Sequence, residues 1–396
     1  MSLSSSSGSS TGATVFDRIN FARGVPAESA FPRAQIEACV EALVSGPDVA
    51  AFQYGSAKGP QQLREWVATN HGVDLDCVMT GDGSVGLFDL LCRIWLRNKQ
   101  TVLVESPCYD RILHRLSDYG ANVISVPLEV DGPGLESLEA AVKQSPRFFY
   151  TVPDFQNPSG VTWSAEKRRH LVDLARVRNF TIVEDSPYRL LRYKGEQQPS
   201  FLEIGPDVTV QLNSFSKIIA PGLRAAYMIA APQTVAIAAK VAESTYVMPG
   251  NFALSVAGEW LRRGYLHEQV ATLRELYGRR AEVMVSALEE YMPTHRFARP
   301  DGGFFIGVTL SNPIDVEQLR TQANVAGVDL SDGAGFFLNA PSTPFLRLPF
   351  CSMDEDTARR GVRTLATAIE RCVQSRFRLG WRGTPEFAKS SGEPDA

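Results

Sequence analysis

Short runs rich in β-branched and aromatic residues alternate, through the middle of this chain, with longer stretches of helical periodicity. The short runs lie at residues 101–105, 122–126, 147–152, 180–184, 208–213 and 224–230, and the helical stretches at 84–96, 108–118, 135–143 and 164–178. This alternation is typical of an α/β fold, in which helices cover a mostly parallel sheet. A short link joins the last two runs, which allows one of them to be antiparallel. Ser84 and Ser164 stand where helix N-caps are expected.

The pattern of predicted elements changes near His267, where a long helical stretch begins. This second block contains helical periodicity at 268–291, an apolar run at 304–310, a helix from Asp315 and a final helix at 353–372. The order predicts a smaller α+β domain. The predicted organisation is an arm at 1–14, a segment at 15–45 that packs on the small domain, a large domain at 46–266, the small domain at 267–376 and a loose tail at 377–396.

The composition excludes several classes of protein. Of the 396 residues, 44% are hydrophobic and 21% are charged, and Lys+Arg 40 against Asp+Glu 44 gives a net charge of −4. A slightly acidic chain lacks the basic surface that nucleic-acid binding requires, and no apolar run is long enough to span a bilayer. We therefore expect a soluble protein that binds neither nucleic acid nor membranes.

The cysteines and histidines form no recognisable metal-binding pattern. The six cysteines include no C-x-x-C pair and the five histidines no H-x-x-x-H pair, so neither a metal site nor a disulfide framework is predicted. Reduced thiols favour a cytoplasmic protein. The arm at 1–14 is rich in Ser, Gly and Thr and lacks the apolar core of a signal peptide, so we expect it to be disordered.

Polar fragments follow several of the predicted strands, where open α/β sheets bind their ligands. They are Gln156 to Gly160, Glu184 to Tyr188, Ser214 to Lys217 and Pro221 to Arg224. Each fragment alone is a weak signal. Together they contain what a pyridoxal 5′-phosphate site requires: a lysine for the Schiff base, a carboxylate for the pyridine nitrogen, and hydroxyls and a guanidinium for the phosphate.

We assign the residues that contact the ring of such a cofactor as follows. Lys217 supplies the amine and acts as general base, and Asp185 keeps the pyridine nitrogen protonated. Asn157 and Tyr188 donate hydrogen bonds to the phenolate oxygen of the ring, which favours the deprotonated Schiff base at neutral pH. Tyr109 stacks on the ring. The predicted catalytic residues are thus Lys217, Asp185 and Tyr188.

The phosphate of the cofactor is expected to lie at the start of a helix. The turn of Gly83, Ser84 and Val85 opens the stretch at 84–96, and its free N–H groups and the helix dipole suit an anion. The permanently charged guanidinium of an arginine can bind the same anion through two hydrogen bonds. The other predicted phosphate ligands are Ser214, Ser216 and Arg224.

These motifs resemble the fold-type I pyridoxal-phosphate enzymes of the class I aminotransferase family, most closely the 2-aminoadipate transaminase-like branch. The resemblance extends from about Ile19 to Ala368, and its most specific part is S-x-S-K with an arginine seven residues later, preceded by D-x-x-Y. It implies a large domain with a mixed, mostly parallel sheet between helices and a smaller α+β domain. The activity it implies is transfer of an amino group from an L-amino acid to a 2-oxo acid, through aldimine and ketimine intermediates on Lys217.

The same resemblance implies the residues that bind the substrate and a second subunit. Arg347, in the stretch "FLRLPF", matches the arginine for the substrate α-carboxylate. Arg23 and Gly24, together with Asn157, match positions beside the substrate. Tyr54 matches a tyrosine that reaches the phosphate of the neighbouring subunit, so a homodimer with shared active sites is expected.

This sequence departs from the family pattern at positions that bear on the substrate. Arg23 replaces a residue that is commonly small, Gly307 one that is often a bulky aromatic, and Val85 one that is commonly polar. Our hypothesis is that Arg23 adds a cation for an anionic substrate group and that Gly307 opens room for a larger substrate.

Other interpretations stay open from the sequence alone. The same cofactor residues serve elimination, replacement or cyclisation, for example on S-adenosylmethionine, and the departures at Arg23 and Gly307 keep this alternative. A non-catalytic effector sensor of the winged-helix regulators would require an N-terminal DNA-binding module. Single residues also have structural interpretations, namely an ion pair for Arg347, a solvated side chain for Arg23, and core packing for Tyr54 and Tyr109.

Overall fold

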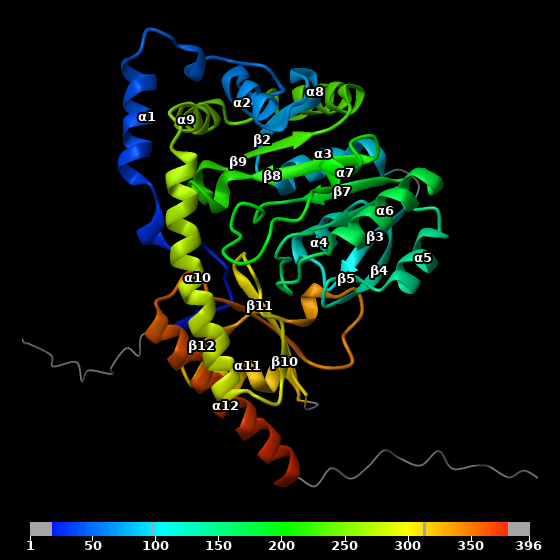
Figure 1. Ribbon diagram of the computed structural model, residues 1–396, viewed down its shortest axis with the longest axis vertical. Coiled ribbons are helices and arrows are strands. Elements are labelled where there is room, and N and C mark those ends of the chain that lie inside the picture. Colours follow the sequence, from blue (N-terminus) through cyan, green and yellow to red (C-terminus); the bar gives the residue numbers. More distant parts are fainter. Residues whose placement is uncertain (1–17, 97–98, 312–313, 379–396) are drawn as a thin grey trace, which may run out of the picture.

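The computed structural model describes residues 18–96, 99–311 and 314–378. The predicted arm at 1–14 and almost all of the predicted tail at 377–396 lie outside these residues. The described chain forms a large α/β part and a smaller α+β part. The long helix α10 (Leu266–Tyr291) runs beside both of them, from the level of the large sheet down to the small part (Figure 1).

The large sheet has the strand order β2-β9-β8-β7-β6-β3-β4-β5. Its strands are β2 (Val78–Asp82), β3 (Thr101–Ser106), β4 (Asn122–Glu129), β5 (Gly132–Pro133), β6 (Phe148–Thr151), β7 (Thr181–Asp185), β8 (Thr209–Ser214) and β9 (Ala225–Ile229). The strands from β8 to β4 are parallel, whereas β9 is antiparallel to both β8 and β2. The predicted mixed, mostly parallel sheet is therefore confirmed, with β9 as the reversed member of the last pair. The edge strand β2 was not predicted, because Thr80, Gly81 and Asp82 leave it only two apolar residues.

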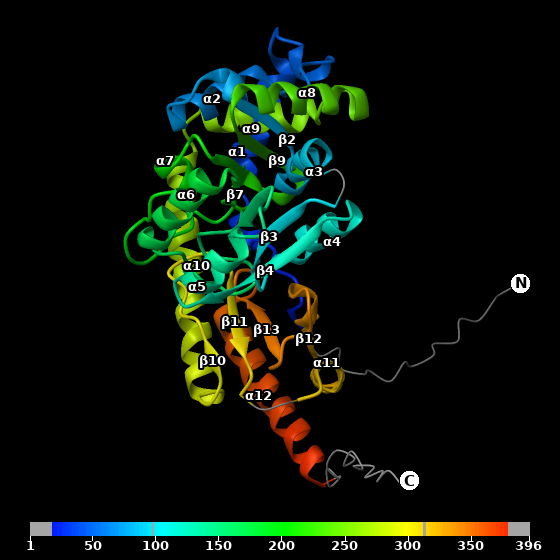
Figure 2. The ribbon, with the colours of Figure 1, turned by 90° about the vertical axis from the view of Figure 1, so that its right-hand side faces the viewer.

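Both faces of the large sheet are buried, and in its central parallel strands alternate residues belong to two separate cores. Phe148 and Tyr150 of β6 pack in the core that includes α3 and α4, whereas Phe149 packs in the core that includes α5, α6 and α7. Figure 2 shows α3 and α4 on one side of the sheet and α6 and α7 on the other. Burial on both faces explains why these strands read as continuous apolar runs.

The helices of the described chain are α1 (Arg33–Ser45), α2 (Gln61–His71), α3 (Ser84–Trp95), α4 (Asp110–Asp118), α5 (Leu135–Val142), α6 (Ala165–Arg178), α7 (Phe201–Ile204), α8 (Pro232–Tyr246), α9 (Asn251–Arg262), α10, α11 (Val316–Val325) and α12 (Glu355–Arg378). Seven of these helices match predicted ones, namely α3 to α6 and α10 to α12, whereas α1, α2, α7, α8 and α9 were not predicted. Ser164 is the N-cap of α6, as expected, and accepts a hydrogen bond from the Lys167 N–H at 3.4 Å.

The expectation that Ser84 caps α3 is wrong, because the N-cap is Gly83 and Ser84 is the first helical residue. Gly83 has φ +92°, and a Cβ atom there would lie 1.9 Å from Nη2 of Arg224. Only glycine combines that backbone conformation with so close an approach. The start of α3 and the guanidinium of Arg224 are thereby held side by side.

The small part combines two small sheets with α11 and α12. The strands β10 (Arg296–Phe297), β11 (Phe305–Thr309) and β13 (Phe345–Pro349) form an antiparallel sheet in the order β10-β11-β13. The strand β1 (Ile19–Phe21) pairs in parallel with β12 (Val328–Leu330), so the start of the described chain joins this part. The segment then leaves it, since α1 contacts α9 beside the large sheet.

A buried ion pair fixes the loop that follows β6. The side chains of Arg168 and Asp154 are fully buried, and Nη2 of Arg168 lies 2.9 Å from Oδ1 of Asp154. Nη1 of Arg189 lies 3.3 Å from the other carboxylate oxygen. The Arg168 guanidinium also donates to the carbonyl oxygens of Pro153 and Trp163, near the two ends of the loop. This loop carries Asn157 into the region of the predicted site.

We predict that Asp154→Asn lowers the free energy of unfolding by about 3–5 kcal/mol, because it leaves the fully buried Arg168 guanidinium without its carboxylate. Chemical unfolding of the two proteins measures the difference. The matched control is Asp207→Asn, which removes the exposed pair between Arg176 and Asp207 and should cost less than about 1 kcal/mol. Equal effects at both positions would contradict the prediction.

Candidate active site

A cavity of about 640 Å³ lies between the carboxyl ends of the central strands and the small part. The predicted site residues that line it are Arg23, Gly24, Ser84, Val85, Tyr109, Asn157, Asp185, Tyr188, Ser214, Ser216, Lys217, Arg224 and Arg347. Two predicted residues are not among its lining residues. Gly83 lies directly behind the Arg224 guanidinium, and Tyr54 is 78% exposed elsewhere on the surface. The structure thus brings together residues that are up to 324 positions apart, Arg23 and Arg347.

Lys217 ends the short 3-10 helix at Phe215–Lys217, which follows β8 directly. Burial lowers the pKa of its amine, and the nearby guanidiniums of Arg224 and Arg347 lower it further. Its Nζ lies 5.6 Å from the centre of the Phe304 ring. A lowered pKa leaves more of the amine neutral near pH 7, and a neutral amine can act as nucleophile and as proton acceptor.

Asp185 is the last residue of β7 and is buried. The Tyr150 hydroxyl donates to its Oδ2 at 2.8 Å, whereas Oδ1 has no hydrogen-bond partner among the described residues. Burial raises the pKa of Asp185 to about 7, against the Tyr150 and Ser84 hydroxyls, which lower it. Tyr150 therefore holds one oxygen in place, whereas the other is buried in the cavity wall without a hydrogen bond from the described chain.

Sequence reasoning missed Tyr150. It lies in β6, one strand away from Asp185, and it is fully buried. The signal that could have found it is a tyrosine in the apolar run "FFY", because a buried tyrosine hydroxyl needs a partner.

Hydroxyl and guanidinium groups gather at the other end of the cavity. The Ser214 hydroxyl accepts from the Ser216 N–H at 3.2 Å and donates to the Ser216 hydroxyl at 3.0 Å. Arg224 follows with φ +54° and donates to the Asp82 carbonyl at 3.3 Å. The first N–H groups of α3, at Ser84 and Val85, border the same space, so this end suits an anion.

Arg347 lies in β13 between two aromatic rings, those of Phe305 at 4.9 Å and Phe336 at 4.8 Å. It donates to Asn157 Oδ1 at 3.2 Å and to the Ala22 carbonyl at 2.7 Å. Its buried Nε has no hydrogen-bond partner, and among the described residues no carboxylate forms an ion pair with it. Burial lowers its pKa. The structural interpretation as an ion pair is therefore not supported, and an anion can complete the site.

The remaining predicted residues of the cavity wall differ in how deeply they are buried. Tyr188 is 4% exposed, with its ring edge-on to Phe305 at 6.0 Å, and burial raises its pKa well above the usual range. Tyr109 is the N-cap of α4 and is partly buried at the cavity wall. Gly24 is required by close packing, because a Cβ atom there would lie 2.1 Å from the Phe305 ring. Arg23, beside it, is exposed at the rim.

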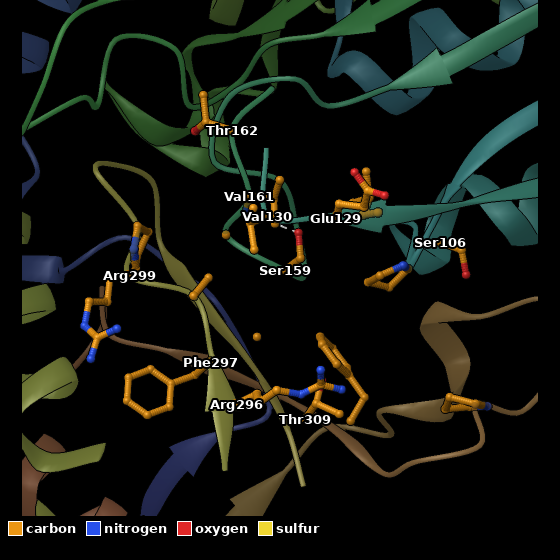
Figure 3. A pocket seen from close by; sticks show the side chains of 18 of the residues that line it. Ser106, Glu129, Val130, Ser159, Val161, Thr162, Arg296, Phe297, Arg299 and Thr309 are labelled. Carbon is orange, nitrogen blue, oxygen red and sulfur yellow. Dashed lines mark hydrogen bonds between the residues drawn. The ribbon is translucent and has the colours of Figure 1, made fainter. Parts of the chain in front are cut away.

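The hypothesis that Gly307 opens room for substrate is wrong. A Cβ atom at Gly307 would lie 2.9 Å from both the Phe345 ring and the Ser159 backbone, and the Gly307 N–H donates to the Ser159 carbonyl at 3.1 Å. Gly307 instead borders a second cavity of about 730 Å³, which has Ser159 on one side and Arg296 and Phe297 on the other (Figure 3). The glycine lets β11 approach the loop after β6.

Within the described residues, no group of His, Cys, Asp and Glu side chains is arranged to hold a metal ion. None of the described helices is long and apolar enough to cross a membrane.

Comparison with known proteins gives one consistent result. A sequence model of the family Aminotransferase class I and II matches residues 17–365. Aromatic-amino-acid aminotransferase 1 of Thermococcus litoralis is 31% identical over 368 residues, covering 89% of this chain and 88% of that protein. The 2-aminoadipate transaminase of Thermus thermophilus is 30% identical over 358 residues, covering 89% of this chain and 90% of that protein.

A solved structure shows the same fold. Pyrococcus horikoshii kynurenine aminotransferase in complex with PMP superposes with a TM-score of 0.86 at 33% identity, covering 90% of this chain and 92% of that chain. The resemblance inferred from the sequence motifs and the fold-type I architecture are both confirmed. The chain therefore belongs to the class I and II aminotransferase family, as a pyridoxal 5′-phosphate-dependent enzyme that transfers amino groups between amino acids and 2-oxo acids.

Proposed function

We propose that the cavity around Lys217 is where this transfer takes place, with Lys217 as the tether of the cofactor and the group that moves the substrate proton. The observation that carries the proposal is the unpaired, buried Oδ1 of Asp185 in the same cavity as the amine. An orphaned carboxylate oxygen is costly in the interior unless a ligand satisfies it. The protonated pyridine nitrogen of the cofactor is such a ligand, so the residues present fit the group.

When bound, the cofactor supplies an electron-withdrawing ring that stabilises negative charge on the substrate Cα. Asp185 would hold the ring nitrogen in its protonated form, and Tyr150 would keep the Asp185 carboxylate in place. Ser214, Ser216, Arg224 and the start of α3 would bind the phosphate. Asn157 and Tyr188 would donate to the phenolate oxygen, and Tyr109 would cover one face of the ring.

The substrate would be oriented by its α-carboxylate. The Arg347 guanidinium contacts the rings of Phe305 and Phe336 and is held by hydrogen bonds to Asn157 and Ala22, so its free Nε–H has a defined direction. A substrate held in this way would present its Cα proton to Lys217. Lys217 Nζ would take that proton, since its lowered pKa keeps the amine neutral near pH 7, and would return it to the former aldehyde carbon of the cofactor.

We predict that the purified protein shows the absorbance band of lysine-bound pyridoxal phosphate and that Lys217→Ala abolishes this band. A single amino acid, added without a 2-oxo acid, should convert the unmodified protein to its pyridoxamine form. Absorbance spectroscopy measures both results. Without the band, the assignment of Lys217 fails. Release of a leaving group without conversion would instead favour elimination or cyclisation, an alternative that has lost the support of Gly307.

We further propose that Arg23 selects amino acids with an acidic side chain. Its guanidinium forms no ion pair among the described residues and lies at the cavity rim, so it is available to an anionic group. The similar Thermus thermophilus protein is named for 2-aminoadipate, an acidic amino acid.

For Arg23→Ala we expect kcat/KM toward acidic amino acids to fall about 10- to 100-fold, the value of one charge-assisted interaction. The kcat/KM toward neutral amino acids should stay within about twofold. Steady-state kinetics with both classes measures the ratio, and Arg33→Ala, which changes an exposed arginine outside the cavity, is the control. An equal loss on both classes would remove Arg23 from substrate selection.

We also propose that a second copy of the chain completes the site. Val49, Phe52, Tyr54 and Phe252 are 67%, 57%, 78% and 38% exposed, and the rings of Phe52 and Phe252 stack at 5.6 Å. Exposed apolar side chains gathered in this way are typical of an interface. Tyr54 stands among them and would reach the partner's phosphate.

The unpaired state of the six cysteines supports a reducing compartment, the cytoplasm.

Mixing two inactive variants tests the shared site. Tyr54→Ala and Lys217→Ala homodimers should each have little activity, but a heterodimer contains one site with both residues intact. After subunit exchange about half of the dimers are mixed, so activity should recover to about a quarter of that of the unmodified enzyme. No recovery, with heterodimers demonstrated by differently tagged chains, would show that Tyr54 serves its own subunit or none.

A further inference from the structure

Glu105 is a buried carboxylate, 1% exposed, near the end of β3. Its Oε1 accepts hydrogen bonds from the Thr151 hydroxyl and the Trp163 indole N–H, both at 2.7 Å. Its Oε2 accepts from the Val152 N–H and the Gln156 side-chain N–H, both at 3.2 Å. Every partner offers a hydrogen, which is the surrounding that an ionised carboxylate requires. Glu105 thereby joins β3 to the end of β6 and to the loop that follows β6.

Gln156 extends this junction to the loops of the candidate site. Its side-chain nitrogen donates a second hydrogen bond, to the Pro107 carbonyl at 2.6 Å. Its side-chain oxygen accepts from the Ser159 N–H at 2.9 Å and from the Ser159 hydroxyl at 2.6 Å. Both amide hydrogens and both oxygen lone pairs are used, so the orientation of the amide is fixed.

The two turns that Gln156 connects carry different residues of the cavity wall. Pro107 is two residues before Tyr109, and Gln156 and Ser159 enclose Asn157. Asn157 in turn holds the Arg347 guanidinium through its Oδ1. A shift of either turn would therefore move a cofactor-contacting side chain, and a shift of the Asn157 turn would also move the group that orients the substrate.

We propose that Glu105 and Gln156 form a buried clamp that positions Tyr109 and Asn157 against the cofactor and Arg347 against the substrate. The clamp residues touch neither ligand, so they are positioning residues. This inference rests on the proposed roles of Tyr109, Asn157 and Arg347. It goes beyond them in assigning a function to the glutamine of "QNPSG" and to the glutamate of "VESP".

The chain offers a matched control in Glu259. This carboxylate is buried, and it accepts hydrogen bonds from the side chains of Gln62, Arg262 and Arg263. Neither Glu259 nor any of these partners lines the cavity. Glu259→Gln should therefore destabilise the fold, as Glu105→Gln does, without moving a residue of the site.

The experiment compares Glu105→Gln, Gln156→Met and Glu259→Gln by three measurements on the cofactor-loaded protein. These are the thermal midpoint, the rate of conversion to the pyridoxamine form in a single turnover, and the pH midpoint of the cofactor absorbance. All three variants should lower the thermal midpoint. Only the two clamp variants should slow the conversion, by about 10- to 100-fold, since misplacement by about 1 Å has such an effect.

The clamp variants should also move the spectral midpoint to higher pH. A displaced Asn157 loses its hydrogen bond to the phenolate oxygen, which otherwise favours the deprotonated form of the bound cofactor. If Glu105→Gln gives no folded protein, Gln156→Met and the milder Ser159→Ala test the proposal. For Ser159→Ala we expect smaller changes in rate and spectral midpoint, in the same direction. Clamp variants that match Glu259→Gln in rate and spectral midpoint would overturn the proposal. Absence of the cofactor band in the unmodified protein would instead reject the proposed function on which the clamp rests.

Discussion

The candidate site depends on the cost of burying polar groups that the protein itself leaves unpaired. Asp185 keeps one carboxylate oxygen, and Arg347 its Nε–H, without a partner in the described structure. A buried group in this condition costs about 1–3 kcal/mol or more, and a charged group costs more than a neutral one. A fold can carry such costs only if its other interactions offset them. Here the two groups line one cavity, in β7 and β13, where the proposed cofactor would satisfy Asp185 and the substrate α-carboxylate would satisfy Arg347.

Most other buried charges near the site are fully paired, and this pairing makes the loops rigid. Asp154 binds Arg168 and Arg189 beside the loop after β6, and Glu184 is held by three donors on the opposite side of its strand from Asp185. Loops that end parallel strands usually gain such rigidity from their neighbours rather than from their own sequence. The rigid surroundings let Asn157 and Tyr109 keep fixed positions although neither lies within a strand.

The parts of the site that could be predicted are those encoded within short segments. Lys217 with its serines and Arg224, and Asp185 with Tyr188, occur at fixed spacings, and the apolar runs before them predict the strand ends on which they stand. Contacts between distant segments were not accessible in this way. Tyr150 was missed because its partner is on the next strand, and Gly307 was misinterpreted because its neighbour, Ser159, is 148 positions away. The edge strand β2 was missed for a related reason, since its pairing with β9 compensates for a weak apolar pattern.

Glu105 and Asp185 show why surroundings, rather than pKa, separate a positioning group from a ligand-binding group. Burial raises the pKa of both carboxyls to about 7, and for both the hydrogen bonds they accept act in the opposite direction. Glu105, however, accepts four hydrogen bonds that engage both of its oxygens, whereas Asp185 accepts one from Tyr150 and keeps its Oδ1 without a hydrogen bond from any described residue. A perturbed pKa therefore marks both groups as unusual without giving their roles. The number of donors around each oxygen does give them: a saturated carboxylate holds the protein in place, and an unsaturated one awaits a partner from outside.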